Sequence, residues 1–179
     1  MALALSLSSS NASAAAITSL WDELSVFEDR PSMRTLNYPP HITFAVYDAP
    51  DVTEKLATAL MRQTANGRAA IEIGFNRIRH FPGSPLILWA DPEPKQALLE
   101  MHQHIHSEIE PELCRSHYRP GSWSPHCTLA TRILPDHDAE ALAFADGFRG
   151  GVRVIFDRID CVQYPPVRVL AEAGLPTET

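Results

Sequence analysis

The chain has 179 residues, of which 45% are hydrophobic and 21% charged, and its formal net charge is −7. This length is typical of one compact domain whose core needs no disulfides, and the acidic balance argues against binding of long nucleic acid. The chain has an odd number of cysteines, Cys114, Cys127 and Cys161, and none of them are in C-x-x-C spacing. This argues against a disulfide scaffold or a thiolate zinc site. We therefore expect a cytoplasmic protein, without a membrane span and monomeric.

Hydrophobic periodicity predicts alternating strands and helices along the chain. The expected strands are 2–7, 41–47, 70–79, 86–90, 126–131, 152–161 and 167–171, and the expected helices are 11–25, 52–64, 94–109 and 137–146. The apolar start of the chain is short and lacks a basic region, so we interpret it as a strand and not as a signal peptide. Residues 173–179 are expected to be a tail, disordered from Gly174.

The chain contains an internal repeat. Residues 71–78 match 152–159 without a gap at an offset of 81, and 85–90 match 166–171 at the same offset. The two copies span approximately 1–84 and 85–172. We expect a single two-lobed α+β domain over the whole chain. Its two antiparallel sheets would face each other across a pseudo-twofold cleft, with helices outside.

Two His-x-Thr motifs lie at equivalent points of the repeat, with His41 and Thr43 in one copy and His126 and Thr128 in the other. Because side chains alternate along a strand, each His and Thr would point away from the lobe's core into the cleft. Two imidazoles can divide the acid and base roles, and two hydroxyls can bind phosphoryl oxygens. A lone strand His is usually structural, but a structural role does not require this pattern twice.

In this duplicated setting the sequence resembles the 2H phosphoesterase superfamily, in the branch of bacterial 2′-5′ RNA ligases and 2′,3′-cyclic nucleotide phosphodiesterases, over roughly residues 2–172. The resemblance implies His41 and His126 as the acid/base pair, Thr43 and Thr128 as phosphate ligands, and no metal or cofactor. The implied substrate is a nucleotide or short RNA with a cyclic phosphate, ADP-ribose 1″,2″-cyclic phosphate, or a 2′-5′ linkage. Residues 77–82 lack the Arg-Pro-Arg run of the ligase branch.

Further side chains are candidates for substrate binding. Arg132 continues the His126 face, and Tyr47 is its equivalent beyond His41. Tyr38, Tyr118 and Trp123 precede the motifs and could stack on a base, with loop packing as the competing explanation. Other arginines are weaker candidates, among them the repeat-equivalent pair Arg77 and Arg158, whose face the alternation leaves open, and Arg79 and Arg119.

His102, His104 and His106 lie on one expected helix, where an i, i+4 pair can bind zinc. No His-Glu-x-x-His pattern and no further ligand is evident, so we expect a solvated helix face. Three hypotheses remain: a 2H-type phosphoesterase, a non-catalytic nucleotide or RNA-end binding module on the same fold, and a metal-dependent hydrolase using the His102 cluster. The motifs leave open whether the enzyme hydrolyses or ligates, and which histidine is the acid.

Overall fold

The computed structural model describes residues 1–177. Eight antiparallel strands form one curled sheet in the order β6-β3-β4-β5-β2-β1-β7-β8. The strands are β1 (Ala2–Ser8), β2 (His41–Tyr47), β3 (Ile71–Phe81), β4 (Leu86–Glu93), β5 (Cys127–Ile133), β6 (Val152–Phe156), β7 (Arg158–Tyr164) and β8 (Arg168–Gly174). The helices are α1 (Ala15–Leu24), α2 (Glu54–Ala65), α3 (Gln96–Glu108) and α4 (Asp138–Gly147).

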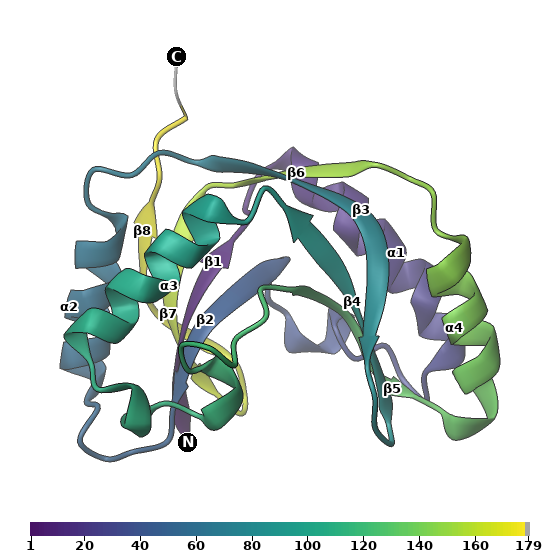
Figure 1. Ribbon diagram of the computed structural model, residues 1–179, viewed down its shortest axis with the longest axis horizontal. Coiled ribbons are helices and arrows are strands. Elements are labelled where there is room, and N and C mark those ends of the chain that lie inside the picture. Colours follow the sequence, from purple (N-terminus) through teal and green to yellow (C-terminus); the bar gives the residue numbers. More distant parts are fainter. Residues whose placement is uncertain (178–179) are drawn as a thin grey trace.

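The sheet is divided into two lobes at its centre (Figure 1). One, here called the β1 lobe, contains β2, β1, β7 and β8 and is covered by α2 and α3, while the β4 lobe contains β6, β3, β4 and β5 and is covered by α1 and α4. Only one pair of facing residues, Ile42 and Cys127, joins β2 to β5. The expected two-lobed α+β fold with helices outside is confirmed, with the two sheets joined at this pair.

Apolar residues at the predicted spacings form the core between the sheet and its helices. Ile17, Leu20 and Leu24 of α1 are buried against the β4 lobe, as a helical period of 3.6 requires. Helix α2 begins after Thr53, whose hydroxyl accepts a hydrogen bond from the Leu56 amide at 3.2 Å and so satisfies one of the free amides of the first turn.

The two sequence halves do not correspond to the two lobes. The chain leaves the β1 lobe after β1, adds α1 to the β4 lobe, and returns to the β1 lobe with β2. In the second half, α3 packs against β2 of the first half, and β7 pairs with β1. The repeat-matched segments are neighbours, because residues 71–75 of β3 pair with β6. Each lobe is therefore built from both halves of the chain.

Asp157 lies where the chain crosses between lobes, in the middle of the expected strand 152–161. That prediction of a single strand is wrong, because the chain breaks into β6 and β7, which lie in different lobes. The Asp157 carboxylate accepts hydrogen bonds from the Ser10 amide at 2.8 Å and the Asn11 amide group at 3.0 Å. Burial raises its pKa, but these bonds together lower it by more, so the pKa lies below its ordinary value. The ionised carboxylate thus joins the two crossing segments.

The end of the chain is ordered further than expected. Residues 173 and 174 belong to β8, and Leu175 is buried, with its amide bonded to the Asp157 carbonyl at 2.7 Å. Burial of one leucine and a bond to the crossing point hold this segment against the domain. Residues 178 and 179 lie outside the described part of the chain. Within residues 1–177, no helix has both the length and the apolar character to cross a membrane.

Replacement of Asp157 by Ala should destabilise the whole domain, because the Ser10 and Asn11 donors at the crossing lose their shared acceptor. We expect a loss of roughly 1–3 kcal/mol in the free energy of unfolding, measured by urea denaturation, and a smaller loss for Asp157→Asn. Asp51→Ala is the matched control, since Asp51 is an exposed carboxylate. Equal stability of the Asp157 and Asp51 variants would contradict the structural role of the crossing.

Candidate active site

The β2–β5 contact brings the two motifs together. Because Ile42 faces Cys127 in an antiparallel pair, His41 is directed toward Thr128, and Thr43 toward His126. Ile42 and Cys127 are fully buried, whereas all four motif side chains are partly exposed, so the four share the face opposite the core. Facing residues in such a pair have Cβ atoms about 5 Å apart and diagonal ones about 7–8 Å. His41 and His126 are diagonal in this pairing, and they are close enough for the charge of His126 to lower the pKa of His41.

Both histidine rings are held by the same backbone arrangement. His41 Nδ1 lies 2.9 Å from the carbonyl oxygen of Pro39, and His126 Nδ1 lies 2.7 Å from that of Ser124. A carbonyl oxygen only accepts, so each Nδ1 must carry its proton and donate it. In the neutral ring, Nε2 is then the basic nitrogen. The fold thus gives both imidazoles the same tautomer, with Nε2 free for a ligand.

The environment of each imidazole disfavours its protonation. The pKa of His41 is lowered to about 4, chiefly by burial and to a smaller extent by the nearby His126, while the bond to Pro39 opposes this shift. Burial also lowers the pKa of His126, again opposed by its backbone bond. The Tyr38 ring lies 4.8 Å from that of His41, and Phe81 and Trp89 lie 5.1 and 5.8 Å from His126. At neutral pH, both rings are neutral in the unliganded protein.

Two tryptophans anchor the strands at the motif threonines. Trp123 Nε1 donates to the Thr43 carbonyl at 3.0 Å, and Trp21 Nε1 donates to the Thr128 carbonyl at 3.1 Å. The indole N–H groups thus satisfy backbone carbonyls at positions where the strand pairing is irregular. Trp123, a candidate for stacking on a base with loop packing as the competing explanation, holds β2 in position, and its ring stacks on His102 at 4.1 Å.

A bulge in β2 changes which side chains face the cleft. Between β1 and β2 the register passes from Leu5 facing Ala45 to Ser6 facing Thr43, so Phe44 is an extra residue. One extra residue exchanges the two faces of a strand beyond it. Val46 therefore lines the cleft, and Tyr47, predicted there, is 1% exposed within the core.

An equivalent bulge follows the second motif. Trp89 faces Thr128 and Leu88 faces Ala130, so Leu129 is the extra residue. Thr131 lines the cleft as a result. Arg132, predicted to continue the His126 face, instead makes two bonds of 2.7 and 2.8 Å to Asp29.

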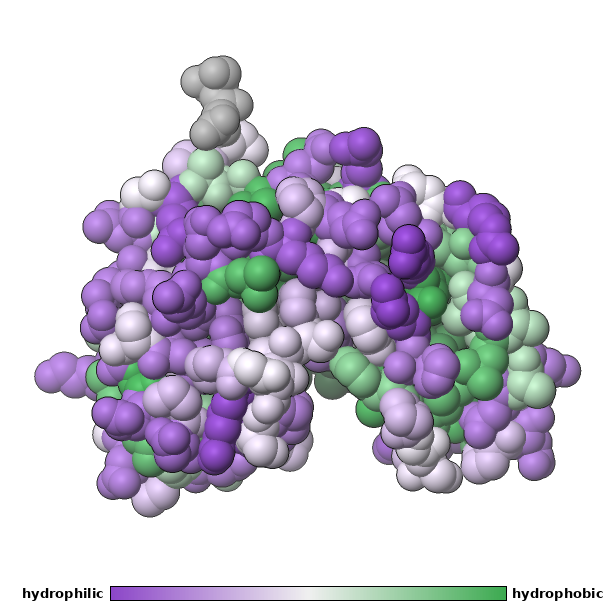
Figure 2. Space-filling model, in the orientation of Figure 1, coloured by the Kyte–Doolittle hydropathy of each residue, from purple (hydrophilic) through white to green (hydrophobic). Residues whose placement is uncertain are grey.

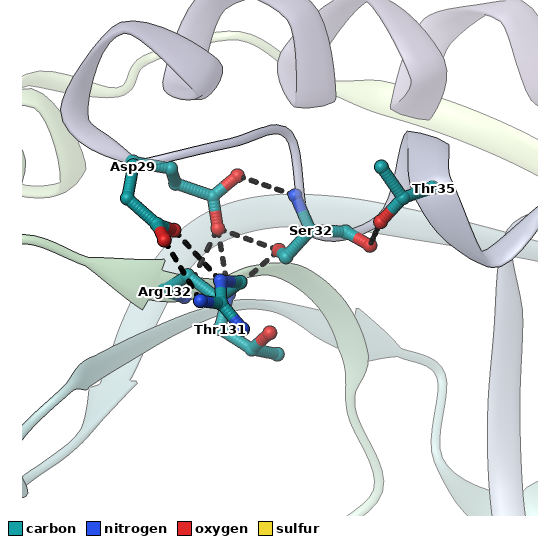
Figure 3. A network of polar contacts seen from close by, with 6 residues as sticks. Asp29, Ser32, Thr35, Thr131 and Arg132 are labelled. Carbon is teal, nitrogen blue, oxygen red and sulfur yellow. Dashed lines mark hydrogen bonds and ion pairs between the residues drawn. The ribbon is translucent and has the colours of Figure 1, made fainter. Parts of the chain in front are cut away.

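A buried glutamate joins the segment after α1 to β5 near this bulge. One Glu28 oxygen accepts from the amides of Thr131 and Arg132 at 3.1 and 3.0 Å. The same carboxylate binds the amide and hydroxyl of Ser32 at 2.9 and 2.5 Å. Figure 3 shows this network with Asp29 and Arg132 paired beside it. Glu28 thereby fixes the start of the segment 33–38, which lines the cleft.

A cavity of about 250 Å³, here called the neutral cavity, adjoins the first motif. Its polar lining comprises Ser6, Tyr38, His41, Thr43, Tyr118, Thr128, Thr131 and Tyr164. Aliphatic side chains of β1, β2, β7 and the segment 33–38 complete it. Tyr38 and Tyr118 are both in this lining, and the Tyr38 hydroxyl donates to Asp160 at 2.7 Å. The notch between the lobes is visible in Figure 2.

Sequence reasoning missed several contributors to this site. Ser6 Oγ lies 3.1 Å from Thr43 Oγ1, and a serine within an apolar strand was the available signal. Tyr164 ends β7 and bonds through its hydroxyl to Arg115, which also pairs with Asp48. Tyr164, Arg115 and Asp48 are far apart in the sequence, so only the folded chain brings them together.

The weaker arginine candidates take different positions. Arg119 donates to the backbone carbonyls of Cys114 and Glu112, each at 2.8 Å, and Arg158 pairs with Glu172 at 3.0 Å. These two therefore have structural partners. Arg77 and Arg79 line a separate depression beside His126.

The expectation of a solvated helix face for the histidines of α3 is wrong. His102 and His106 are buried, at 5% and 7% exposure, because they pack beneath Trp123 and β2. His102 Nε2 is bonded to the Tyr118 carbonyl at 2.7 Å. Within residues 1–177, no group of three or more His, Cys, Asp or Glu side chains is arranged to hold a metal ion.

Comparisons with known proteins identify the family and the fold. A family model described as the 2′-5′ RNA ligase superfamily matches residues 9–166. The fold is similar to that of TT0787 of Thermus thermophilus, at 20% identity and a TM-score of 0.69 over 100% of both chains. It is also similar to E. coli LigT complexed with NADP⁺, at 14% identity and a TM-score of 0.60, covering 98% of this chain and 97% of that one. A further structure described as a phosphoesterase has 14% identity and a TM-score of 0.59, with 98% of both chains covered. Curated protein sequences gave no match.

Both motif histidines should titrate below the ordinary imidazole pKa of 6.5 in the unliganded protein, with His41 near 4. The reason is that burial disfavours the charged ring. NMR of the ring C–H resonances across a pH series measures both midpoints, with His41→Ala and His126→Ala variants assigning the signals. A midpoint at or above 6.5 for either ring would contradict the structure.

Proposed function

The chain belongs to the 2′-5′ RNA ligase superfamily, and from this we propose that it is a metal-independent phosphoesterase that hydrolyses a cyclic phosphodiester. The proposed substrate is a 2′,3′-cyclic nucleotide, an RNA end with such a phosphate, or ADP-ribose 1″,2″-cyclic phosphate. His41 and His126 are the proposed acid/base pair, and Thr43 and Thr128 the proposed phosphate ligands. The confirmed superfamily supports a phosphoesterase enzyme, while the reaction and the residue roles are our proposal.

The observation that carries the proposal is the matched tautomer of the two imidazoles. Each ring donates Nδ1–H to the carbonyl two residues before it, which leaves both Nε2 atoms free on the cleft face. Two such nitrogens on one face of the β2–β5 contact can serve as base and, once one ring is protonated, as acid in general acid–base catalysis.

The proposed reaction is an in-line hydrolysis. Nε2 of one histidine takes a proton from water as its oxygen bonds to phosphorus. The bond from phosphorus to one ribose oxygen breaks, and Nε2–H of the other histidine protonates that oxygen. The product is a phosphomonoester, and transfer of a proton from the first ring to the second through solvent restores the site. The hydroxyls of Thr43 and Thr128 donate to the phosphoryl oxygens, where negative charge increases.

The two competing hypotheses make different demands on the site. A non-catalytic binding module would use the neutral cavity but would not need two free imidazole nitrogens. A metal-dependent hydrolase built on His102 and His106 requires exposed ligands, whereas both rings are buried. 2′-5′ ligation or phosphodiesterase activity at the same site remains the alternative reaction, because the same acid/base pair serves phosphodiester formation in reverse.

His41→Ala and His126→Ala should each reduce the turnover of a 2′,3′-cyclic nucleotide about 10²–10⁴-fold, because each removes one proton-transfer group. The assay is a panel of 2′,3′-cyclic mononucleotides, ADP-ribose 1″,2″-cyclic phosphate and 2′-5′ oligoadenylate, with and without EDTA. The chelator should have no effect. His137→Ala is the control, since His137 pairs with Glu140 outside the cleft. Turnover that survives both motif substitutions would refute the proposal, and nucleotide binding without turnover would favour the binding module.

The pH profile of kcat/KM should be bell-shaped, with its maximum below pH 6.5. One ring must be protonated and the other neutral, and both pKa values are lowered in the free enzyme. The fraction with one protonated ring therefore falls about tenfold per pH unit above the higher pKa. Below the lower pKa both rings are protonated and no base remains. A plateau extending from neutral to alkaline pH would contradict this division of roles.

A further inference from the structure

The two sides of the cleft differ chemically although the motifs match. The neutral cavity of the β1 lobe contains no Asp, Glu, Lys or Arg in its lining. It presents three tyrosines, Tyr38, Tyr118 and Tyr164, beside aliphatic side chains. Such a surface suits the uncharged base and sugar of a nucleotide.

On the other side of His126, the β4 lobe has a shallow depression of about 820 Å³, here called the basic depression. Trp89 and Ser124 belong to its lining. The Trp89 ring lies 5.8 Å from that of His126, and the Ser124 carbonyl holds His126 Nδ1. His126 therefore stands at the border of the depression, with Phe81 stacked on Trp89 at 5.0 Å.

Positive charge predominates in the basic depression. Its lining has four cationic side chains, Arg77, Arg79, Lys95 and Arg149, against the carboxylates Asp91 and Asp146. This local surplus contrasts with the net charge of −7 for the whole chain.

Two of these cations are held in place, and two are free to bind a ligand. The buried Asp91 carboxylate pairs with Arg79 at 2.6 Å and Lys95 at 2.7 Å. Arg149 is exposed and donates to the carbonyls of Asp146 and Phe148, so no carboxylate neutralises it among the described residues. Arg77 is exposed, and within residues 1–177 it makes neither an ion pair nor a hydrogen bond to a side chain.

We propose that the basic depression binds a second phosphate of the substrate, the one on the 5′ side of the ribose that carries the cyclic phosphate. The inference rests on the proposed function and specifies its substrate class. The neutral cavity would hold the base, the two motifs the cyclic phosphate, and Arg77 and Arg149 the 5′ phosphate. Arginine suits this role because its guanidinium binds two phosphate oxygens at once. The asymmetry fixes one orientation of the substrate in an otherwise pseudo-symmetric site.

The test compares adenosine 2′,3′-cyclic phosphate with the same compound carrying a 5′ phosphate, and with a dinucleotide ending in the cyclic phosphate. The wild-type protein should prefer both phosphorylated substrates by on the order of tenfold in kcat/KM. The preference should decline as salt rises, because the contacts are exposed charges. A benefit confined to the dinucleotide would indicate stacking of the second base and would overturn the phosphate assignment.

The double variant Arg77→Gln/Arg149→Gln should bring the ratio of the two kcat/KM values close to one, whereas Arg77→Lys/Arg149→Lys should retain most of it. Arg62→Gln is the matched control, since it removes one exposed arginine from α2 on the other lobe and should leave the ratio unchanged. A ratio of one in the wild type, or a ratio that the double variant leaves intact, would overturn the inference while cyclic phosphodiester hydrolysis stands. Absence of turnover of every substrate would overturn the proposed function itself.

Discussion

The short contact between β2 and β5 determines the candidate site. Ile42 and Cys127 are the only facing pair between these strands, and the indoles of Trp21 and Trp123 anchor the threonine carbonyls on either side. Because strand spacing is fixed by backbone hydrogen bonding, this contact also fixes the separation of the two imidazoles. The rest of the fold holds the two lobes at the angle that keeps the cleft open around it.

The sequence predicts the motif geometry well because strand alternation is reliable over three residues. It fails one residue later, at Phe44 and Leu129, where both strands bulge. A bulge depends on what the neighbouring strand offers, and that strand is distant in the sequence. The only local sign is the unbroken apolar run that begins at Phe44. Strict alternation would place a polar residue directly after it, where the chain has Ala45. For this reason Val46 faces the cleft in place of Tyr47.

The missed strand break and the buried histidines have a similar cause. Asp157 and its repeat equivalent Asn76 both lie where strand pairing is interrupted, yet β3 only bulges there while the later segment divides into β6 and β7. The difference arises from the crossing segment at Ser10 and Asn11, which only the folded chain brings to Asp157. His102 likewise is a polar residue, and its burial follows from the stacked Trp123 ring, the packing of α3 on β2 and the bond to the Tyr118 carbonyl, which only the folded chain provides.

The crossing of the chain between the lobes has a consequence for the two copies of the repeat. Since α1 packs on β5 and β6, and α2 on β7 and β8 more than on β1, most of the partner surface of both helices comes from the second copy of the repeat. A single copy would therefore leave most of the apolar face of both helices uncovered. With both copies in one chain, one side of the cleft can be neutral and the other basic while the two motif histidines stay the same.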